Sequence, residues 1–117
     1  KNYDIYRKGC DFIQKFIFPG SLLPSVKVMN ESITQKTDMK VIDLERIGPS
    51  YATTLNMWSE KFNDNKENII ELGFDEYFIN LWNYYFSYCE AGFRAGTIDD
   101  VQMVITGGKA NAWSIWE

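Results

Sequence analysis

Residues 48–55 read Gly-Pro-Ser-Tyr-Ala-Thr-Thr-Leu, and they open a run with helical periodicity. Gly48 and Pro49 break the segment before them, and the Ser50 hydroxyl is a natural N-cap for a helix that begins there. Large side chains then recur at intervals of four, three and four residues: Tyr51, Leu55, Trp58 and Phe62. The stretch therefore predicts a helix that carries these four side chains on one face.

The residues before this helix predict two more helices and a strand. Helical spacing of apolar residues indicates a helix from its N-cap Asp4 to Phe16, ended by the reversal at 19–20, a Pro-Gly pair. A second helix is predicted from Ser25 to about Thr34. Residues 38–44 are rich in β-branched side chains and partly alternate, which indicates a strand.

The residues after it predict the longest helix and a second strand. A polar hinge over 63–68 and a short turn closed by Gly73 lead to a helix capped by Asp75, which ends near Ala95. The last predicted strand is Val101 to Thr106. A turn at 107–108, both glycine, follows it, and no element is assigned to the tail over 113–116.

Two aromatic-rich stripes run along the longest predicted helix, and an apolar arc of that width needs cover on two sides. The first consists of Phe78, Trp82, Tyr85, Cys89 and Phe93. The neighbouring one consists of Tyr77, Leu81, Tyr84 and Tyr88.

Length, charge and cysteine content exclude several classes of function. A chain of 117 residues forms at most one domain, and its net charge of −4, concentrated in the second half, argues against nucleic acid as a partner. Cys10 and Cys89 are isolated and no histidine is present, so we expect free thiols in a reducing cytosol and no zinc site. We expect neither a signal peptide nor a membrane span, since no long apolar run occurs.

Tyr51 is the residue best suited to a chemical role. Without histidine the chain cannot complete a serine or cysteine triad that relies on an imidazole. Tyr51 is expected in the first turn of its helix, where free backbone N–H groups and the positive end of the dipole favour an anion. The phenol would add one more donor. The alternative is a tyrosine that only packs the face formed with Leu55, Trp58 and Phe62.

Three stretches in register resemble one family. They are the Phe-Ile-Phe-Pro-Gly of 16–20 leading into the Leu-Pro-Ser of 23–25, the 48–55 stretch, and Trp-Asn-Tyr-Tyr-Phe-Ser-Tyr-Cys-Glu-Ala-Gly-Phe-Arg over 82–94. Together they resemble the C-terminal part of the cyclopropane-fatty-acyl-phospholipid synthases and mycolic acid cyclopropane synthases, which are S-adenosylmethionine-dependent methyltransferases. Residues 1–15 and 101–105 fit the same family pattern.

The resemblance implies an α/β fold. We expect residues 1–117 to be a single partial domain, the C-terminal fragment of a Rossmann-like class I methyltransferase fold, mostly helical with a C-terminal antiparallel strand pair. The half that binds S-adenosylmethionine would lie upstream and be absent, so no cofactor-binding residue is expected here and the fragment alone should be inactive. Exposed strand edges predict self-association, and hence a possible homo-oligomer.

It also implies a reaction and a site. The family transfers a methyl group to a cis double bond of an acyl chain, and the tyrosine matching Tyr51 helps to hold a bicarbonate ion that acts as the base. In the family, the positions matching Leu55, Tyr85, Cys89 and Phe93 face the lipid. Trp58 is added to them because it is predicted on the same helix face as Leu55. The expected acyl channel is therefore Leu55, Trp58, Tyr85, Cys89 and Phe93, with Phe78 and Trp82 read as core.

The implied substrate is an unsaturated acyl phospholipid. The whole enzyme would be cytoplasmic and peripheral to the inner face of the membrane. Two alternatives stay open: a related methyltransferase with another lipid or small-molecule acceptor, and a non-catalytic lipid-binding or assembly module. Ser50, where many relatives carry histidine, and Ser21, where a second glycine often follows, keep the first alternative open.

Overall fold

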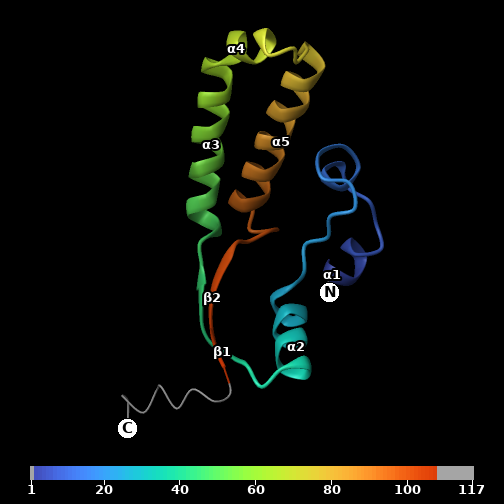
Figure 1. Ribbon diagram of the computed structural model, residues 1–117, viewed down its shortest axis with the longest axis vertical. Helices are drawn as coiled ribbons and strands as arrows, with labels where there is room; N and C mark the ends of the chain where they lie inside the picture. Colours follow the sequence, from blue (N-terminus) through green and yellow to red (C-terminus); the bar gives the residue numbers. More distant parts are fainter. Residues whose placement is uncertain (1, 108–117) are drawn as a thin grey trace. The chain divides into compact units, whose positions relative to one another are not determined.

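The computed structural model describes residues 2–107, which fall into two compact units (Figure 1). One unit spans residues 45–102. The other consists, within the described range, of residues 2–44 and 103–107. The glycine at 108 and the tail over 113–116 lie outside the described residues. No described helix combines the length and apolar character needed to cross a bilayer.

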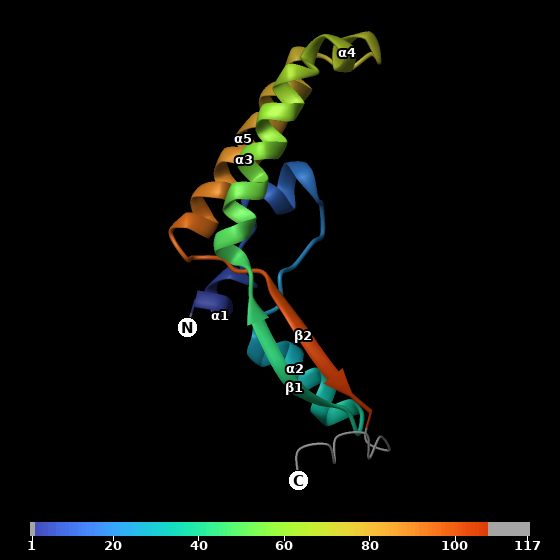
Figure 2. The same ribbon diagram turned by 90° about the vertical axis from the view of Figure 1, so that its left-hand side faces the viewer.

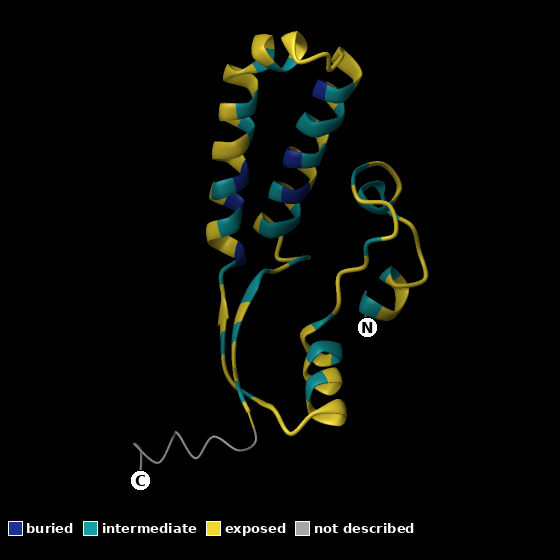
Figure 3. Cartoon of the chain, in the orientation of Figure 1, coloured by how far each residue is buried: buried dark blue, intermediate teal, exposed yellow. Residues whose placement is uncertain are grey.

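The unit of residues 45–102 is a helical hairpin. Helices α3 (Gly48–Asp64) and α5 (Glu76–Arg94) lie side by side, and the short α4 (Lys66–Glu71) joins them at one end (Figures 1 and 2). Their facing sides carry the buried hydrophobic core of the described residues, which is coloured dark blue in Figure 3. It consists of Ala52, Leu55, Ile79, Phe86 and Cys89.

Local signals explain how α5 begins. The Asp75 side chain accepts a hydrogen bond from the Phe78 N–H at 2.9 Å, which makes it the predicted N-cap. Gly73 precedes it with a φ of +97°, a conformation that favours glycine. The predicted cap, turn and length of this helix are confirmed.

The start of α3 differs from the prediction. The helix begins at Gly48 with Ile47 in the N-cap position, and Ser50 lies inside it without capping. The Gly48 N–H donates instead to Asp99, at the far end of the unit's sequence, at 3.1 Å. The predicted hinge over 63–68 is also wrong, because α3 runs to Asp64 and α4 starts at Lys66, so that only Asn65 interrupts the helices.

The N-terminal segment forms two short elements where one long helix was predicted. These are α1 (Asn2–Tyr6) and a single π-helical turn, η1 (Ile13–Ile17). Asp11 and Gln14 exchange backbone-to-side-chain hydrogen bonds at 2.9 and 2.8 Å, a reciprocal cap that starts a new helix. Asp4 lies within α1 and pairs with Arg7 at 3.0 Å, so it is not the N-cap.

The remaining elements follow the prediction closely. Ser25 caps α2 (Val26–Lys36), which ends two residues later than expected, and Gly20 has the positive φ of +81° that the reversal requires. Strands β1 (Lys40–Arg46) and β2 (Val101–Thr106) form the predicted antiparallel pair, with β1 displaced by two residues. Beyond β1, the Ile47 N–H donates to the Asp100 carbonyl at 2.9 Å.

Candidate functional site

Tyr51 lies near the start of α3, with two aromatic rings against its own. The Trp58 ring meets it edge-on at a centroid distance of 5.8 Å, and the Phe93 ring from α5 lies 5.1 Å away. Within the described residues the Tyr51 hydroxyl makes no hydrogen bond. The structure thus brings three predicted site residues together and leaves a phenol O–H available to a ligand.

Two further predicted residues fill the contact layer between α3 and α5. Leu55 is 1% exposed and Cys89 is 5% exposed. Both side chains are therefore packed against protein in this structure, as core residues would be. A wall of an acyl channel would leave part of each side chain open to that channel, so within the described residues this burial fits the core role.

Tyr85 has a strongly raised pKa. Burial raises the pKa of its phenol to about 12, helped by the neighbouring Cys89 thiol, with which it forms a hydrogen bond, and by Tyr51. The Trp82 ring meets the Tyr85 ring edge-on at 5.2 Å. Tyr85 therefore stays a neutral phenol beside Tyr51 across the physiological pH range.

The other members of the predicted stripe differ in burial. Trp58 is 45% exposed, so its ring forms an edge of the cluster and not a buried wall. Phe78 and Trp82 are half-buried; Phe78 stacks on Phe74 with centroids 4.3 Å apart. The neighbouring stripe is largely uncovered within the described residues, since Tyr77, Tyr84 and Tyr88 are 64%, 54% and 42% exposed.

The start of α3 does not offer the predicted backbone anion site. One first-turn N–H group, that of Gly48, is bound by the Asp99 carboxylate, and Pro49 has no N–H. A second anion at this helix end would also meet the negative charge of Asp99. The expectation from the helix dipole is therefore wrong in this respect, and Tyr51 can contribute only its hydroxyl.

Sequence reasoning missed the residues that hold the two helices together. Ile79 and Phe86 are 1% and 6% exposed, and the Phe86 ring lies 5.5 Å from that of Phe62 on α3. Their separation of seven residues, which continues to Phe93, is the heptad signal that would have found them. The pair belongs to the hairpin core.

A separate open hollow lies in the unit that contains α2. Its lining mixes hydroxyl, charged and apolar groups: Thr34, Thr37, Asp38, Met39, Lys40, Thr106 and Gly107. None of the predicted site residues contributes to it. The Thr37 hydroxyl already donates to the Ile33 carbonyl at 2.7 Å, and that of Thr34 donates to the Asn30 carbonyl at 2.9 Å.

Comparison with known proteins identifies relatives of this chain. Residues 1–103 match the mycolic acid cyclopropane synthetase family. The tuberculostearic acid methyltransferase UfaA1 of Mycobacterium tuberculosis is 42% identical over 94 residues, which are 80% of this chain and 22% of that protein. The cyclopropane-fatty-acyl-phospholipid synthase of Escherichia coli K12 is 34% identical over 100 residues, which are 86% and 25% of the two chains.

Solved structures agree with the sequence comparison. A crystal structure of mycolic acid cyclopropane synthase CmaA1 complexed with SAH and CTAB superposes with a TM-score of 0.76 at 31% identity, covering 89% of this chain and 35% of that one. The cyclopropane synthase MmaA2 from Mycobacterium tuberculosis gives a TM-score of 0.74 at 28% identity, covering 87% and 34%. The chain spans about a quarter of the length of the two curated relatives described above.

Proposed function

This chain belongs to the mycolic acid cyclopropane synthetase family, and we propose that it is the acyl-binding part of an S-adenosylmethionine-dependent methyltransferase that forms cyclopropane rings on unsaturated phospholipid chains. The observation that carries the proposal is the cluster around Tyr51, where two helices place Trp58 and Phe93 against a phenol whose hydroxyl has no partner among the described residues.

In this proposal Tyr51 donates its O–H to a bicarbonate ion, the base of the reaction. Phe93 and Tyr85 present ring faces to the acyl chain, while Leu55 and Cys89 keep the interior apolar. The burial that raises the pKa of Tyr85 to about 12 supports this division, because it places the phenol in an apolar environment next to Tyr51.

The chemistry needs an environment of this kind. Methyl addition to one alkene carbon leaves a cation on the other, and loss of a proton from the new methyl lets the C–H electron pair close the ring. Aromatic faces stabilise such a cation by about 0.5–2 kcal/mol each when water is absent. Exclusion of water also prevents its capture as an alcohol.

S-Adenosylmethionine supplies an electrophilic methyl group when it is bound. Among the described residues, the turn that leads from a strand into a helix is the β1–α3 turn, and the Gly48 amide in this turn is already bound by Asp99. The described residues therefore do not fit a site for the cofactor. We therefore propose that another part of the whole protein binds the cofactor, and that residues 1–117 act as one partial domain of that protein.

The whole protein would reach its lipid from the cytoplasmic face of the membrane, as a peripheral protein.

Self-association of the isolated chain remains expected, because both strands expose large apolar side chains: Ile42, Val104 and Ile105 are 45%, 47% and 43% exposed. Sedimentation of the chain at micromolar concentration tests this, and a pure monomer would contradict it.

A second candidate function keeps the fold and changes the product. The relative that is 42% identical is named a methyltransferase and not a cyclopropane synthase, which favours a methyl branch as the alternative outcome. Methyl transfer followed by proton loss gives a methyl-branched or methylene-branched alkene of the same mass as the cyclopropane, since a saturated branch would need a separate hydride donor. Incubation of the whole protein with unsaturated phospholipid and proton NMR of the product separates the two, because only the cyclopropane carries ring methylene protons.

The test of Tyr51 is Tyr51→Phe in the whole protein, with Tyr77→Phe as the matched control on the exposed side of α5. We expect product formation to fall about 100-fold or more in Tyr51→Phe and to stay unchanged in Tyr77→Phe. An active Tyr51→Phe protein would contradict the proposed role. A protein inactive in every form on lipid, yet folded, would favour a non-catalytic lipid-binding module.

A further inference from the structure

We propose that Trp58 is a positioning residue that determines where the Tyr51 hydroxyl points. The inference rests on the proposed function, in which that hydroxyl holds the bicarbonate. Trp58 and Tyr51 lie two turns apart on α3, and their rings meet edge-on with centroids 5.8 Å apart and an interplanar angle of 81°. This is a favoured geometry for an aromatic pair.

Ring contacts are what orient this tyrosine within the described residues. A tyrosine on a helix has few accessible rotamers, and a hydrogen bond to its hydroxyl is the usual way to select one. The Tyr51 hydroxyl has no such bond here. The ring contacts with Trp58 and, at 5.1 Å, with Phe93 are therefore the specific interactions that favour one direction of the ring, and with it the position of the phenol oxygen.

The two contacts differ in what else they do. Phe93 comes from α5, is half-buried and so also joins the two helices. Trp58 is 45% exposed, belongs to the same helix as Tyr51 and makes no ring contact with α5 among the described residues, so shortening its side chain removes the contact with Tyr51 and no ring contact between the helices. An effect of Trp58 on the reaction would thus report on Tyr51 and not on the stability of the hairpin.

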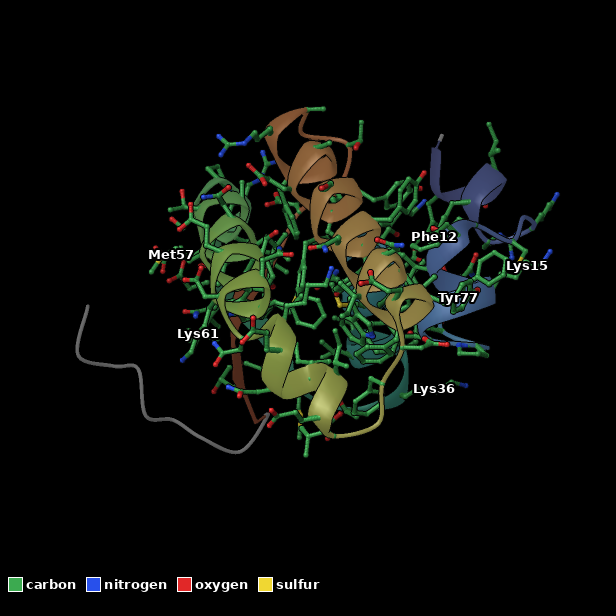
Figure 4. All side chains as sticks on the ribbon, turned by 90° about the horizontal axis from the view of Figure 1, so that it is seen from above. Phe12, Lys15, Lys36, Met57, Lys61 and Tyr77 are labelled. Carbon is green, nitrogen blue, oxygen red and sulfur yellow. The ribbon has the colours of Figure 1, made fainter. Side chains whose placement is uncertain are left out.

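The next residue on α3 provides a matched control. Met57 is 61% exposed and projects from α3 on the side away from α5 (Figure 4). Met57→Ala removes a large apolar side chain from the same turn without touching the Tyr51 ring. Trp58→Phe keeps an aromatic ring at the position and serves as the conservative variant.

The experiment measures product formation by the whole protein against bicarbonate concentration. We expect Trp58→Ala to need about tenfold more bicarbonate for half-maximal rate. Its maximal rate and its KM for lipid should stay near those of the native protein. Trp58→Phe should recover most of the difference and Met57→Ala should show none. NMR of the tyrosine-labelled protein gives a second readout. The Tyr51 resonance is identified by its loss in Tyr51→Phe. In Trp58→Ala only, the chemical shifts of its ring should be averaged over several ring orientations.

Other outcomes overturn the inference. An unchanged bicarbonate dependence in Trp58→Ala contradicts it, as does a raised KM for lipid, which would make Trp58 a wall of the acyl channel. If Tyr51→Phe abolishes the bicarbonate dependence while Trp58→Ala leaves it intact, the inference fails and the proposed function stands. If the native protein shows no dependence on bicarbonate, both fail together.

Discussion

Asp99 caps helix α3 from outside it: its Oδ1 accepts the Gly48 N–H at 3.1 Å, and its Oδ2 accepts a hydrogen bond from Arg46 Nε. The acceptor lies 51 residues beyond the helix start. The cap ties the end of β1 to the start of β2, next to the backbone bond from Ile47 to Asp100. It also places a carboxylate where an anion ligand would otherwise bind.

Gly48 leaves no room for a side chain beside this cap. A Cβ there would lie 3.2 Å from Asp99 Cγ and 3.3 Å from Asp99 Cα, with the carboxylate oxygen closer still. We expect Gly48→Ala to lower the free energy of unfolding by about 1–3 kcal/mol, measured by urea denaturation. Gly107→Ala, with open space around its Cβ, is the control and should change little. Equal stability of the two variants would contradict this reading.

Asp99 makes the hairpin sensitive to acid. The hydrogen bond from Arg46 holds the pKa of Asp99 below its ordinary range against the opposing effect of burial, and the charge of Arg46 and the backbone amides of Asp100 and Gly48 lower it further. Because the folded pKa is depressed, this stabilisation is present above the pKa of an unfolded aspartate, near 4, and is lost as the pH falls through the lower folded value. Thermal melts from pH 6 to pH 2 should show a smaller acid-induced loss in Asp99→Asn than in the native chain.

Tyr85 makes the opposite prediction at alkaline pH. Its folded pKa of about 12 lies above the ordinary value of 10.0, so its contribution to stability is complete below pH 10 and falls as the pH rises from 10 to 12. Tyr85→Phe removes this contribution while keeping the ring. The difference in unfolding free energy between the native chain and Tyr85→Phe should therefore shrink across that interval. A difference that stays constant would contradict the raised pKa.

Leu55 and Met57 test where the core lies. Leu55 is 1% exposed between the helices, whereas Met57 is 61% exposed. Leu55→Ala should destabilise the chain by about 2–5 kcal/mol, and Met57→Ala by about 0.5 kcal/mol or less. Chemical denaturation of both variants measures the contrast. Similar values would mean that the α3–α5 layer is not the core.

Asn63 and Asn83 form a reciprocal amide pair between α3 and α5. Each side chain donates to the other, at 2.7 and 3.0 Å. A double-mutant cycle with Asn63→Ala and Asn83→Ala should give a coupling energy of about 0.5–1.5 kcal/mol. Asn56→Ala is the control on α3, since Asn56 bonds to Glu60 on its own helix. Additive effects of Asn63→Ala and Asn83→Ala would show that the pair contributes nothing.

Elements with local signals were predictable from the sequence. Asp75 and Ser25 cap their helices through amides three residues on, and Gly20 and Gly73 adopt the positive φ that their turns need. The N-terminal helix was predicted too long because the reciprocal cap of Asp11 and Gln14 went unrecognised, although its Asp-x-x-Gln spacing is visible in the sequence.

The candidate site was predictable as a set of residues and not as an arrangement. The stripe containing Tyr85, Cys89 and Phe93 follows from helical periodicity. Which part of a wide apolar arc faces α3 depends on the rotation of α5 about its axis, and the periodicity leaves that open. The structure places Ile79 and Phe86 in the contact layer and leaves Tyr77 and Tyr84 exposed.

The sequence by itself determined the family and the order of α2, β1, α3, α5 and β2, but not α4, because caps, turn glycines and periodicity act over a few residues. Only the tertiary structure decided how α3 starts and which rings surround Tyr51. Asp99 and Phe93 reach that helix from 51 and 42 residues away, by the numbering of their partners Gly48 and Tyr51. Contacts across such separations arise from packing and carry no local signal.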